Sequence, residues 1–191
     1  MGTPIRLVIF GRQGAGKGTQ CQNLVERYGV IHISTGDMLR AERAAGTELG
    51  ERAGKIMDAG GLVGDDIMIP VAANRLAEDD ARAAGFVLDG FPRTIEQAEG
   101  LLDALGTDQL HAAVDLEVPI DEVMARMKAR AREDDTDEAI AQRLALYEEQ
   151  TRPVLDFFAD RGMMRVVDGL GTETQVRDRL FTAVDEALAD E

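Results

Sequence analysis

The chain of 191 residues has one cysteine, no tryptophan, three lysines and no hydrophobic run of membrane-spanning length. A single cysteine excludes an intrachain disulfide and a zinc site built on several cysteines. The first residues, MGTPIRLVIF, lack the basic segment and cleavage site of a signal peptide, so we expect a cytoplasmic protein that does not contact membranes. The net charge of −15 argues against binding to a nucleic acid backbone.

A glycine-rich segment follows a strand-like run at residues 5–10. It reads GRQGAGKGTQ, a near form of G-x-x-x-x-G-K-[ST] in which Gly18 precedes Thr19. Glycines let the backbone N–H groups approach phosphate oxygens, while Lys17 supplies charge for the β- and γ-phosphates and Thr19 a hydroxyl near magnesium. An ordinary glycine turn needs neither of those side chains. The dinucleotide pattern G-x-G-x-x-G is excluded, because Thr19 stands where its third glycine belongs. The segment predicts a nucleoside-triphosphate site.

Five strand-like runs alternate with helical stretches along the chain, at 5–10, 30–33, 86–88, 112–118 and 163–167. This βαβα rhythm predicts an α/β fold with a parallel sheet. Thr94 and Thr172 precede helical patterns and fit the N-cap position. Residues 34–85 are too long for a plain crossover helix, so we expect an inserted helical subdomain there.

Two segments that follow strands carry chemistry. In STGDMLR, Ser34 or Thr35 can cap a helix, and Arg40 lies about one and a half turns along it. In FVLDGFPR, Asp89 ends a strand where open α/β sheets place ligands, and it resembles a carboxylate that holds magnesium through water. Arg93 follows it across a stiff Gly-Phe-Pro turn. Each segment alone is also compatible with a structural cap or an exposed turn.

Four arginines surround an acidic stretch, EDDTDE, at residues 133–138. Arg126 and Arg130 share a helix face, and the acidic stretch is expected to end that helix before Arg143. Together with Arg132, these residues fit a mobile cover over a polyphosphate. Salt bridges on solvated helices are the simpler explanation for any one of them alone.

Taken together, the segments GRQGAGKGTQ, STGDMLR, GGLVGDDI, FVLDGFPRT, the arginines and VDG resemble the adenylate kinase family from end to end, in its order and spacing. The resemblance implies a P-loop nucleoside monophosphate kinase fold with a five-stranded parallel sheet. It implies a core domain of residues 1–33, 64–128 and 136–191, a monophosphate-binding subdomain at 34–63 and a short lid at 129–135. It further implies a monomer that needs Mg²⁺, acts on ATP, AMP and ADP, and has no zinc site.

The same resemblance assigns site residues. ATP would be bound by Gly14, Ala15, Gly16, Lys17, Gly18, Thr19, Arg126, Arg130 and Gly171. AMP would be bound by Thr35, Arg40, Gly61, Leu62, Val63, Gly90, Phe91, Pro92, Arg93, Gln97, Arg132 and Arg143. The catalytic residues would be Lys17, Arg93, Arg132 and Arg143. Asp134 and Asp135 would be lid carboxylates, with Thr19 and Asp89 near the magnesium.

Three positions depart from the family pattern: Gln13 replaces a usual proline, and Gly64 and Asp66 differ just after the monophosphate subdomain. Three alternatives remain. A UMP/CMP kinase is the first, although that group tends to have alanine at Thr35 and asparagine at Thr94. A GTP-using AMP kinase would keep nearly every motif. A non-catalytic nucleotide-binding protein would not need every charged contact to be filled.

Overall fold

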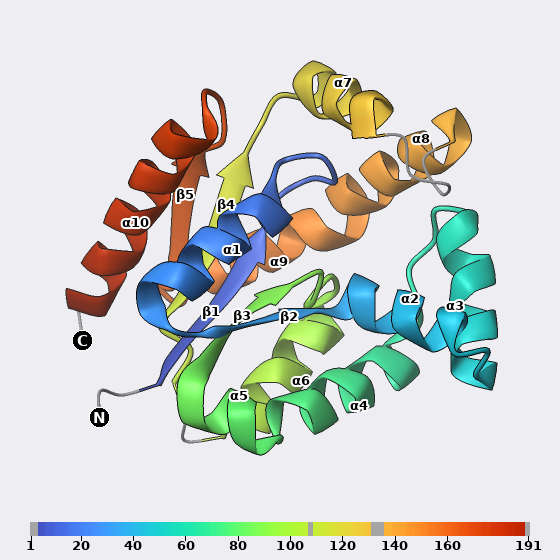
Figure 1. Cartoon of the computed structure of the whole chain (residues 1–191), viewed down its shortest axis with the longest axis horizontal. Helices are drawn as coiled ribbons and strands as arrows, with labels where there is room; N and C mark the ends of the chain where they lie inside the picture. The colour runs from blue at the N-terminus through green and yellow to red at the C-terminus, as the bar shows by residue number, and fades with distance from the viewer. Residues whose placement is uncertain (1–3, 107–108, 131–135, 190–191) are drawn as a thin grey trace.

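The computed structural model describes residues 4–106, 109–130 and 136–189, which form one sheet with helices on both faces (Figure 1). The strands are all parallel, in the order β2-β3-β1-β4-β5. Their bounds are Ile5–Phe10 (β1), Ile31–Ser34 (β2), Gly85–Asp89 (β3), Ala112–Glu117 (β4) and Met164–Asp168 (β5). The predicted parallel sheet is confirmed, with every strand end within one residue of its expected place.

The central strand β1 is buried on both faces of the sheet. Successive side chains of a strand point to opposite faces, so β1 contributes to the hydrophobic clusters on both sides. Val8 and Phe10 pack into one hydrophobic cluster, whereas Leu7 and Ile9 pack into the other. The first cluster is covered by α4 (Asp65–Leu76), α6 (Ile95–Leu105) and α9 (Arg152–Ala159). The second is covered by α1 (Lys17–Tyr28) and α10 (Glu173–Ala189). Each fully buried side chain of this kind contributes about 1.5–3 kcal/mol.

The segment between β2 and β3 is helical, as predicted, and contains α2 (Thr35–Ala44), α3 (Glu48–Asp58), α4 and α5 (Asp79–Ala84). The hydroxyls of Ser34 and Thr47 cap α2 and α3, accepting from the N–H groups of Asp37 and Gly50 at 3.3 and 3.0 Å. Helices α2 and α3 approach so closely that a Cβ added to Gly50 would lie 2.2 Å from the backbone nitrogen of Arg43, so the contact requires glycine. In Figure 1 this pair projects to the side of the molecule away from α10.

The predicted break near the acidic stretch is confirmed. The structure describes helix α7 over Ile120–Arg130, and α8 (Asp137–Leu146) begins after Thr136, whose backbone is extended and whose hydroxyl accepts from the N–H of Ala139 at 3.1 Å. A π-helical turn, η1 (Tyr147–Thr151), then joins α8 to α9. Among the described residues, none of the helices combines the length and the apolar character that crossing a membrane requires.

The register brings three strand ends together at one edge of the sheet. Asp89 at the end of β3 pairs with Ile9 of β1 and with Ser34 of β2. Consequently the glycine loop after β1, the start of α2 and the turn after β3 meet at the carboxyl edge, where open α/β sheets bind ligands.

Candidate functional site

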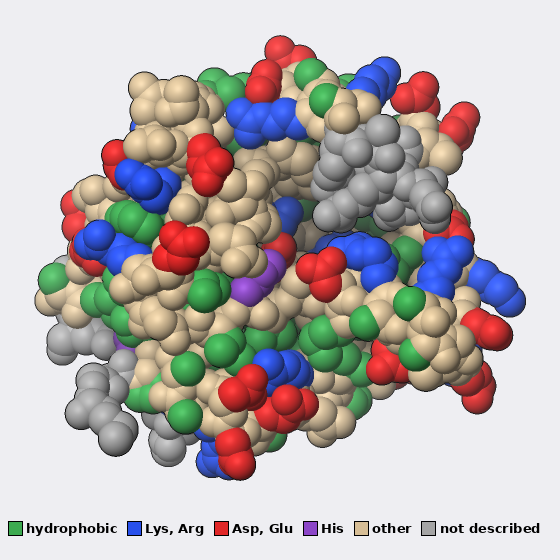
Figure 2. Space-filling view, viewed as in Figure 1, with side chains coloured by type: hydrophobic (Ala, Val, Ile, Leu, Met, Phe, Trp, Pro, Cys, Tyr) green, Lys and Arg blue, Asp and Glu red, His purple; other side chains and the backbone are tan. Residues whose placement is uncertain are grey.

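A cleft of about 510 Å³ lies at this edge, within the range of small-ligand sites. Figure 2 shows a hollow near the centre of this face, with Lys or Arg side chains at its rim. The predicted site residues that line the cleft are Gly14, Gly16, Lys17, Gly18, Thr19, Thr35, Arg40, Gly61, Leu62, Val63, Asp89, Gly90, Phe91, Pro92, Arg93, Gln97, Arg126 and Arg143. The structure therefore brings together segments that lie far apart in the sequence.

Among the described residues, two further predicted positions, Ala15 and Gly171, do not line the cleft. Ala15 is buried in the hydrophobic cluster beneath the glycine loop. Gly171 is exposed after β5, with φ of +115°. The predicted positions Arg132, Asp134 and Asp135, and the side chain of Arg130, lie outside the described residues.

The glycine loop is shaped to receive an anion. Gly14 and Gly16 have φ of +89° and +98°, in the left-handed region that favours glycine, and a Cβ on Gly14 would lie 2.8 Å from the carbonyl oxygen of Val123. Gly16 begins α1 without a side-chain cap, and the first turn carries no acidic residue. The first N–H groups of α1 and its positive dipole end are therefore suited to phosphate.

Lys17 and Arg126 place positive charge beside this loop. The Lys17 ammonium donates to the carbonyl oxygens of Gly11 at 2.8 Å and Arg12 at 3.3 Å. Arg126 donates to Glu122 at 2.7 Å, and its two terminal nitrogens reach the carbonyls of Ala15 and Gly169 at 3.3 and 3.4 Å. The Arg126 guanidinium thus spans from the glycine loop to the loop after β5.

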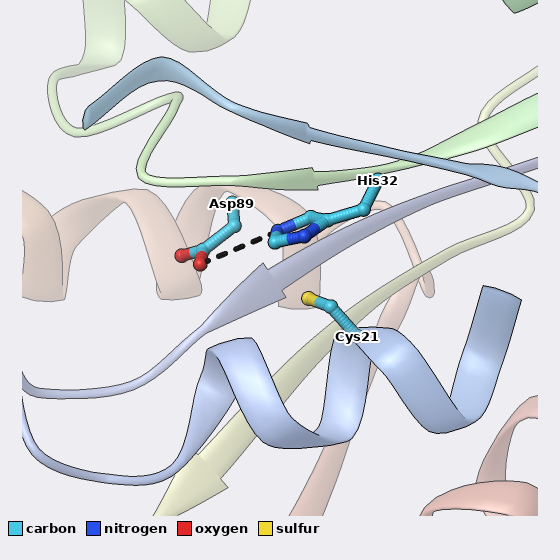
Figure 3. A group of neighbouring side chains, drawn as sticks. All are labelled: Cys21, His32 and Asp89. Atoms are coloured by element: carbon cyan, nitrogen blue, oxygen red, sulfur yellow. Dashed lines mark ion pairs between the residues drawn. The ribbon is translucent and has the colours of Figure 1, made fainter. Parts of the chain in front are cut away.

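Asp89 lies at the base of the cleft beside His32 and Cys21 (Figure 3). Its Oδ2 is 3.6 Å from His32 Nε2, too far for a hydrogen bond, and that nitrogen is buried without a hydrogen-bond partner. Burial alone would raise the pKa of the Asp89 carboxyl, but His32, Lys17 and Arg93 lower it below its ordinary value. Asp89 is therefore ionised at neutral pH.

The three residues of Figure 3 offer one sulfur, one nitrogen and one oxygen ligand, all within 4.8 Å of one another. Sequence spacing did not indicate this convergence. Magnesium prefers oxygen ligands and keeps several waters, so it does not fit this mixed set as a cage. Burial, and to a lesser extent the Asp89 charge, raise the pKa of the Cys21 thiol well above its ordinary value. Protonated Cys21 is a poor ligand, whereas the Asp89 carboxylate with the Thr19 hydroxyl in the cleft lining suits a hydrated divalent cation bound mainly to phosphates.

Three arginines that line the cleft, Arg93, Arg40 and Arg143, lie close enough for the charges of two to act on the third. Burial lowers the pKa of Arg93, Asp89 raises it, and the neighbouring charges of Arg143 and Arg40 lower it further. Arg93 Nε donates to the carbonyl oxygen of Gly90 at 2.8 Å, which fixes the guanidinium beside the turn. Arg40 pairs with Asp37 one turn earlier in α2. Mutually repelling cations around a cleft form a site for a multivalent anion.

Arg143 links two parts of the molecule. Its Nη2 donates to the carbonyl oxygen of Met57, near the end of α3, at 2.8 Å. The adjacent Gly60 also packs closely on α8, because a Cβ there would lie 2.7 Å from the carbonyl oxygen of Ala139. The helix that carries Arg143 therefore contacts the helical insertion directly.

Thr35 is not the cap of α2. The cap is Ser34, while Thr35 is 2% exposed and its Oγ1 donates to the carbonyl oxygen of Asp89 at 3.4 Å. A Cβ on Gly90 would lie 2.9 Å from the same Oγ1. The purely capping interpretation of Thr35 is therefore wrong, and its hydroxyl belongs to the cleft.

Gln97 is 2% exposed, and its carboxamide is held by Asp65 of α4 and by Arg93 of the turn before α6. Its Oε1 accepts from the N–H of Arg93 at 2.8 Å, and its Nε2 donates to Asp65 at 2.7 Å. Thr94 caps α6, as predicted, by accepting from the N–H of Gln97 at 3.2 Å, and its hydroxyl donates to Asp65 at 3.1 Å. Sequence reasoning missed Asp65, which reads as an ordinary acidic residue at a helix start.

A second group that the sequence did not indicate joins the glycine loop to η1. Arg12 forms an ion pair with Glu148 and lies 5.4 Å from the centre of the Tyr147 ring. Tyr147 lines the cleft and donates to Asp115 at 3.2 Å. Thr151, at the end of η1, donates to the carbonyl oxygen of Arg93 at 3.2 Å. The π-helical turn thus contacts both sides of the cleft.

Comparison with known proteins agrees with the resemblance to the adenylate kinase family that the sequence motifs indicate. A family model described as Adenylate kinase matches residues 9–163. A protein named adenylate kinase from Stenotrophomonas maltophilia (strain R551-3) is 48% identical over 94% of this chain and 99% of its own length. Proteins of the same name from Maricaulis maris and Trichlorobacter lovleyi are 44% and 42% identical, each over 95% of this chain and 100% of their own length. With its parallel sheet, glycine loop and cationic cleft, this chain belongs to the adenylate kinase family.

Proposed function

We propose that this enzyme transfers the γ-phosphoryl group of Mg-ATP reversibly to AMP, giving two ADP. The observation that carries the proposal is that Arg93, Arg40 and Arg143 line the same cleft as the glycine loop. One loop suits the phosphates of a triphosphate, and the arginines suit those of a second nucleotide. The relatives named adenylate kinase support the same substrates.

On the ATP side, the loop from Gly14 to Thr19 would hold the phosphates through backbone N–H groups and the Lys17 ammonium. The Lys17 ammonium, which donates to the carbonyls of Gly11 and Arg12, extends from the first turn of α1 beside this loop and supports this role. Arg126 bridges the glycine loop and Gly169, which supports the proposal that its planar guanidinium would stack on the adenine. Gly171 would offer its carbonyl to that base, and Arg130 would add charge.

On the AMP side, Arg93 and Arg40 would bind the phosphate and Gln97 would contact the adenine edge. Thr35 and the backbone of Gly61, Leu62 and Val63 would enclose the base. Their positions along the cleft lining fit this assignment. Arg132 and Arg143 would bridge the phosphoryl group in transfer, and Asp134 and Asp135 would help to organise lid closure.

The chemistry needs positioning and charge neutralisation more than covalent help, because the acceptor is already an anionic phosphate. Thr19 and, through water, ionised Asp89 would hold the divalent cation, which we propose to be Mg²⁺ and which would supply neutralising charge for the phosphates. Lys17 and the arginines would stabilise the charge that develops on the transferred group. No general base is required.

We also propose a monophosphate-binding subdomain at residues 34–63 and a short lid at 129–135, on a core of residues 1–33, 64–128 and 136–191. The Arg143–Met57 contact between α8 and the helical insertion is a point where such parts meet. Closure of these parts would exclude water and so limit hydrolysis of ATP. The proposal includes a monomeric, cytoplasmic enzyme without nucleic acid partners. The net charge of −15 supports the absence of nucleic acid partners. Size-exclusion chromatography tests the monomeric state, and cell fractionation tests the cytoplasmic location.

The test is a coupled assay of ADP formation with ATP or GTP as donor and AMP, CMP, UMP or GMP as acceptor. We expect AMP with ATP to give the highest kcat/KM by orders of magnitude, because a hydrogen-bonding pocket rejects a base that leaves its polar groups unpaired. Faster turnover of CMP or UMP would favour a pyrimidine nucleotide kinase, and a preference for GTP would reassign the donor. Nucleotide binding without turnover would contradict the enzymatic proposal.

A further inference from the structure

We propose that Asp65 is a positioning residue that fixes the orientation of the Gln97 carboxamide, and thereby makes the acceptor site select 6-amino over 6-oxo purines. This inference rests on the proposed function, in which Gln97 contacts the acceptor base. Asp65 acts only through Gln97 and does not line the cleft.

The geometry joins the starts of two helices. Asp65 is the first residue of α4, and its Oδ1 accepts from Gln97 Nε2 at 2.7 Å while its Oδ2 accepts from Thr94 Oγ1 at 3.1 Å. Gln97 Oε1 accepts from the N–H of Arg93 at 2.8 Å. The carboxamide is therefore held at both ends, in a position that is 2% exposed.

These partners determine which end of the amide is nitrogen. An ionised carboxylate only accepts hydrogen bonds, and a backbone N–H only donates them. Rotating the Gln97 amide by half a turn would set its oxygen against the Asp65 carboxylate and its NH₂ against the N–H of Arg93. Two favourable contacts would then become two repulsive ones, and a buried polar group left without a partner is costly. Asp65 and Arg93 thus permit one orientation.

That orientation has a consequence for the base. With one N–H given to Asp65 and one lone pair given to Arg93, the amide retains one N–H at Nε2 and one lone pair at Oε1. Adenine offers the matching groups, an acceptor at N1 and a donor at N6. Hypoxanthine offers the opposite ones, a donor at N1 and an acceptor at O6. An amide that is free to rotate would serve both bases, whereas a fixed one favours the 6-amino purine.

The neighbouring residue supplies a matched control. Asp66 is also acidic and also lies in the first turn of α4, so it has a similar relation to the helix dipole. It is exposed, and Gln97 bonds to Asp65 instead. The variants Asp65→Ala and Asp66→Ala therefore separate the positioning of Gln97 from general effects on the helix.

The experiment measures kcat/KM for AMP and for IMP with Mg-ATP, and compares their ratio among variants. IMP is the probe because it differs from AMP only in the groups at N1 and C6. We expect Asp65→Ala to lower the AMP/IMP ratio by about tenfold or more, and Asp66→Ala to leave it within about twofold of the native ratio. Asp65→Asn should largely retain the native ratio, since its oxygen can accept from Gln97 and its nitrogen can donate to Thr94. Asp65→Ser, which is too short to reach Gln97, replaces the alanine variant if that variant does not fold.

A double-mutant cycle with Gln97→Ala separates the two levels of the proposal. If Asp65 acts through Gln97, Asp65→Ala should not change the AMP/IMP ratio further in the Gln97→Ala background. A native ratio in Asp65→Ala, while Gln97→Ala lowers the ratio, would overturn the positioning role and leave the proposed function intact. A ratio unaffected by Gln97→Ala would instead refute the assignment of Gln97 to the acceptor base.

Discussion

Replacing Lys17 by alanine should abolish most turnover and leave the fold in place. The substitution removes one positive charge and, among its contacts, the hydrogen bonds that the ammonium donates to the carbonyls of Gly11 at 2.8 Å and Arg12 at 3.3 Å. A contact that stabilises charge in the transition state is worth about 2.7–4 kcal/mol, or roughly 10²–10³ in kcat. We therefore expect kcat for ADP formation to fall by roughly 10²–10³.

The stability cost of this substitution should be smaller. At about 1 kcal/mol for each lost hydrogen bond, the variant should lose about 2 kcal/mol of unfolding free energy. For a chain of this size that loss lowers Tm by about 4–8 °C. The control is Lys55→Ala, which removes an exposed lysine of α3. Coupled kinetics and a melting curve measure both effects. A folded Lys17→Ala enzyme with near-native kcat would refute the assigned role of the glycine loop.

Three further results follow from the structure. Thr35→Ala should erode the preference for AMP over CMP and UMP, whereas Ser34→Ala should lower the unfolding free energy by about 1 kcal/mol and keep that preference. Measurements of kcat/KM alongside melting curves distinguish the two variants. A loss of selectivity in Ser34→Ala and a loss of stability alone in Thr35→Ala would contradict the assignment. Turnover should require added Mg²⁺. Purified protein should hold no stoichiometric zinc, since one cysteine and two separated histidines do not build the usual closed zinc site; about one zinc per chain by elemental analysis would disprove this. Burial is the main reason that the pKa of Tyr28 is raised, to about 12, and that the pKa of Tyr147 is raised as well. The stability that comes from keeping both phenols neutral is therefore full below pH of about 10. It is lost as the pH rises through the pKa values that the two groups have in the folded protein. Native protein at pH of about 10 should therefore show far less tyrosinate absorbance than denatured protein, and equal absorbance would refute the burial of both rings.

The sequence was sufficient to locate the five strands and to predict that they are parallel, because each contains a short apolar run and helical stretches separate them, but it did not predict their order in the sheet. The helical insertion was predictable from its length alone. The π-helical turn η1 was not predicted, since it differs from an α-helix only in hydrogen-bond spacing, which no residue type in Tyr147–Thr151 specifies. Thr94 was recognisable as a cap because its partner lies three residues away.

The site was predictable where its residues are contiguous. The glycine loop and the turn from Asp89 to Arg93 each carry a motif in one stretch of chain. The contacts that fix these motifs join distant residues. Asp65 and Gln97 are 32 positions apart, and Arg143 and Met57 are 86 positions apart. Local spacing holds no signal for such pairs, because the fold alone brings them together.

The most direct test of the account supplies the enzyme with a single nucleotide, ADP, and Mg²⁺. An enzyme that joins a triphosphate site to an AMP site across one cleft must convert two ADP into one ATP and one AMP. The measurement is the time course of all three nucleotides by chromatography or phosphorus NMR. We predict equal amounts of ATP and AMP at every time, with no net release of inorganic phosphate. AMP or phosphate formed without matching ATP would contradict the account, since it would show hydrolysis in place of transfer between two bound nucleotides.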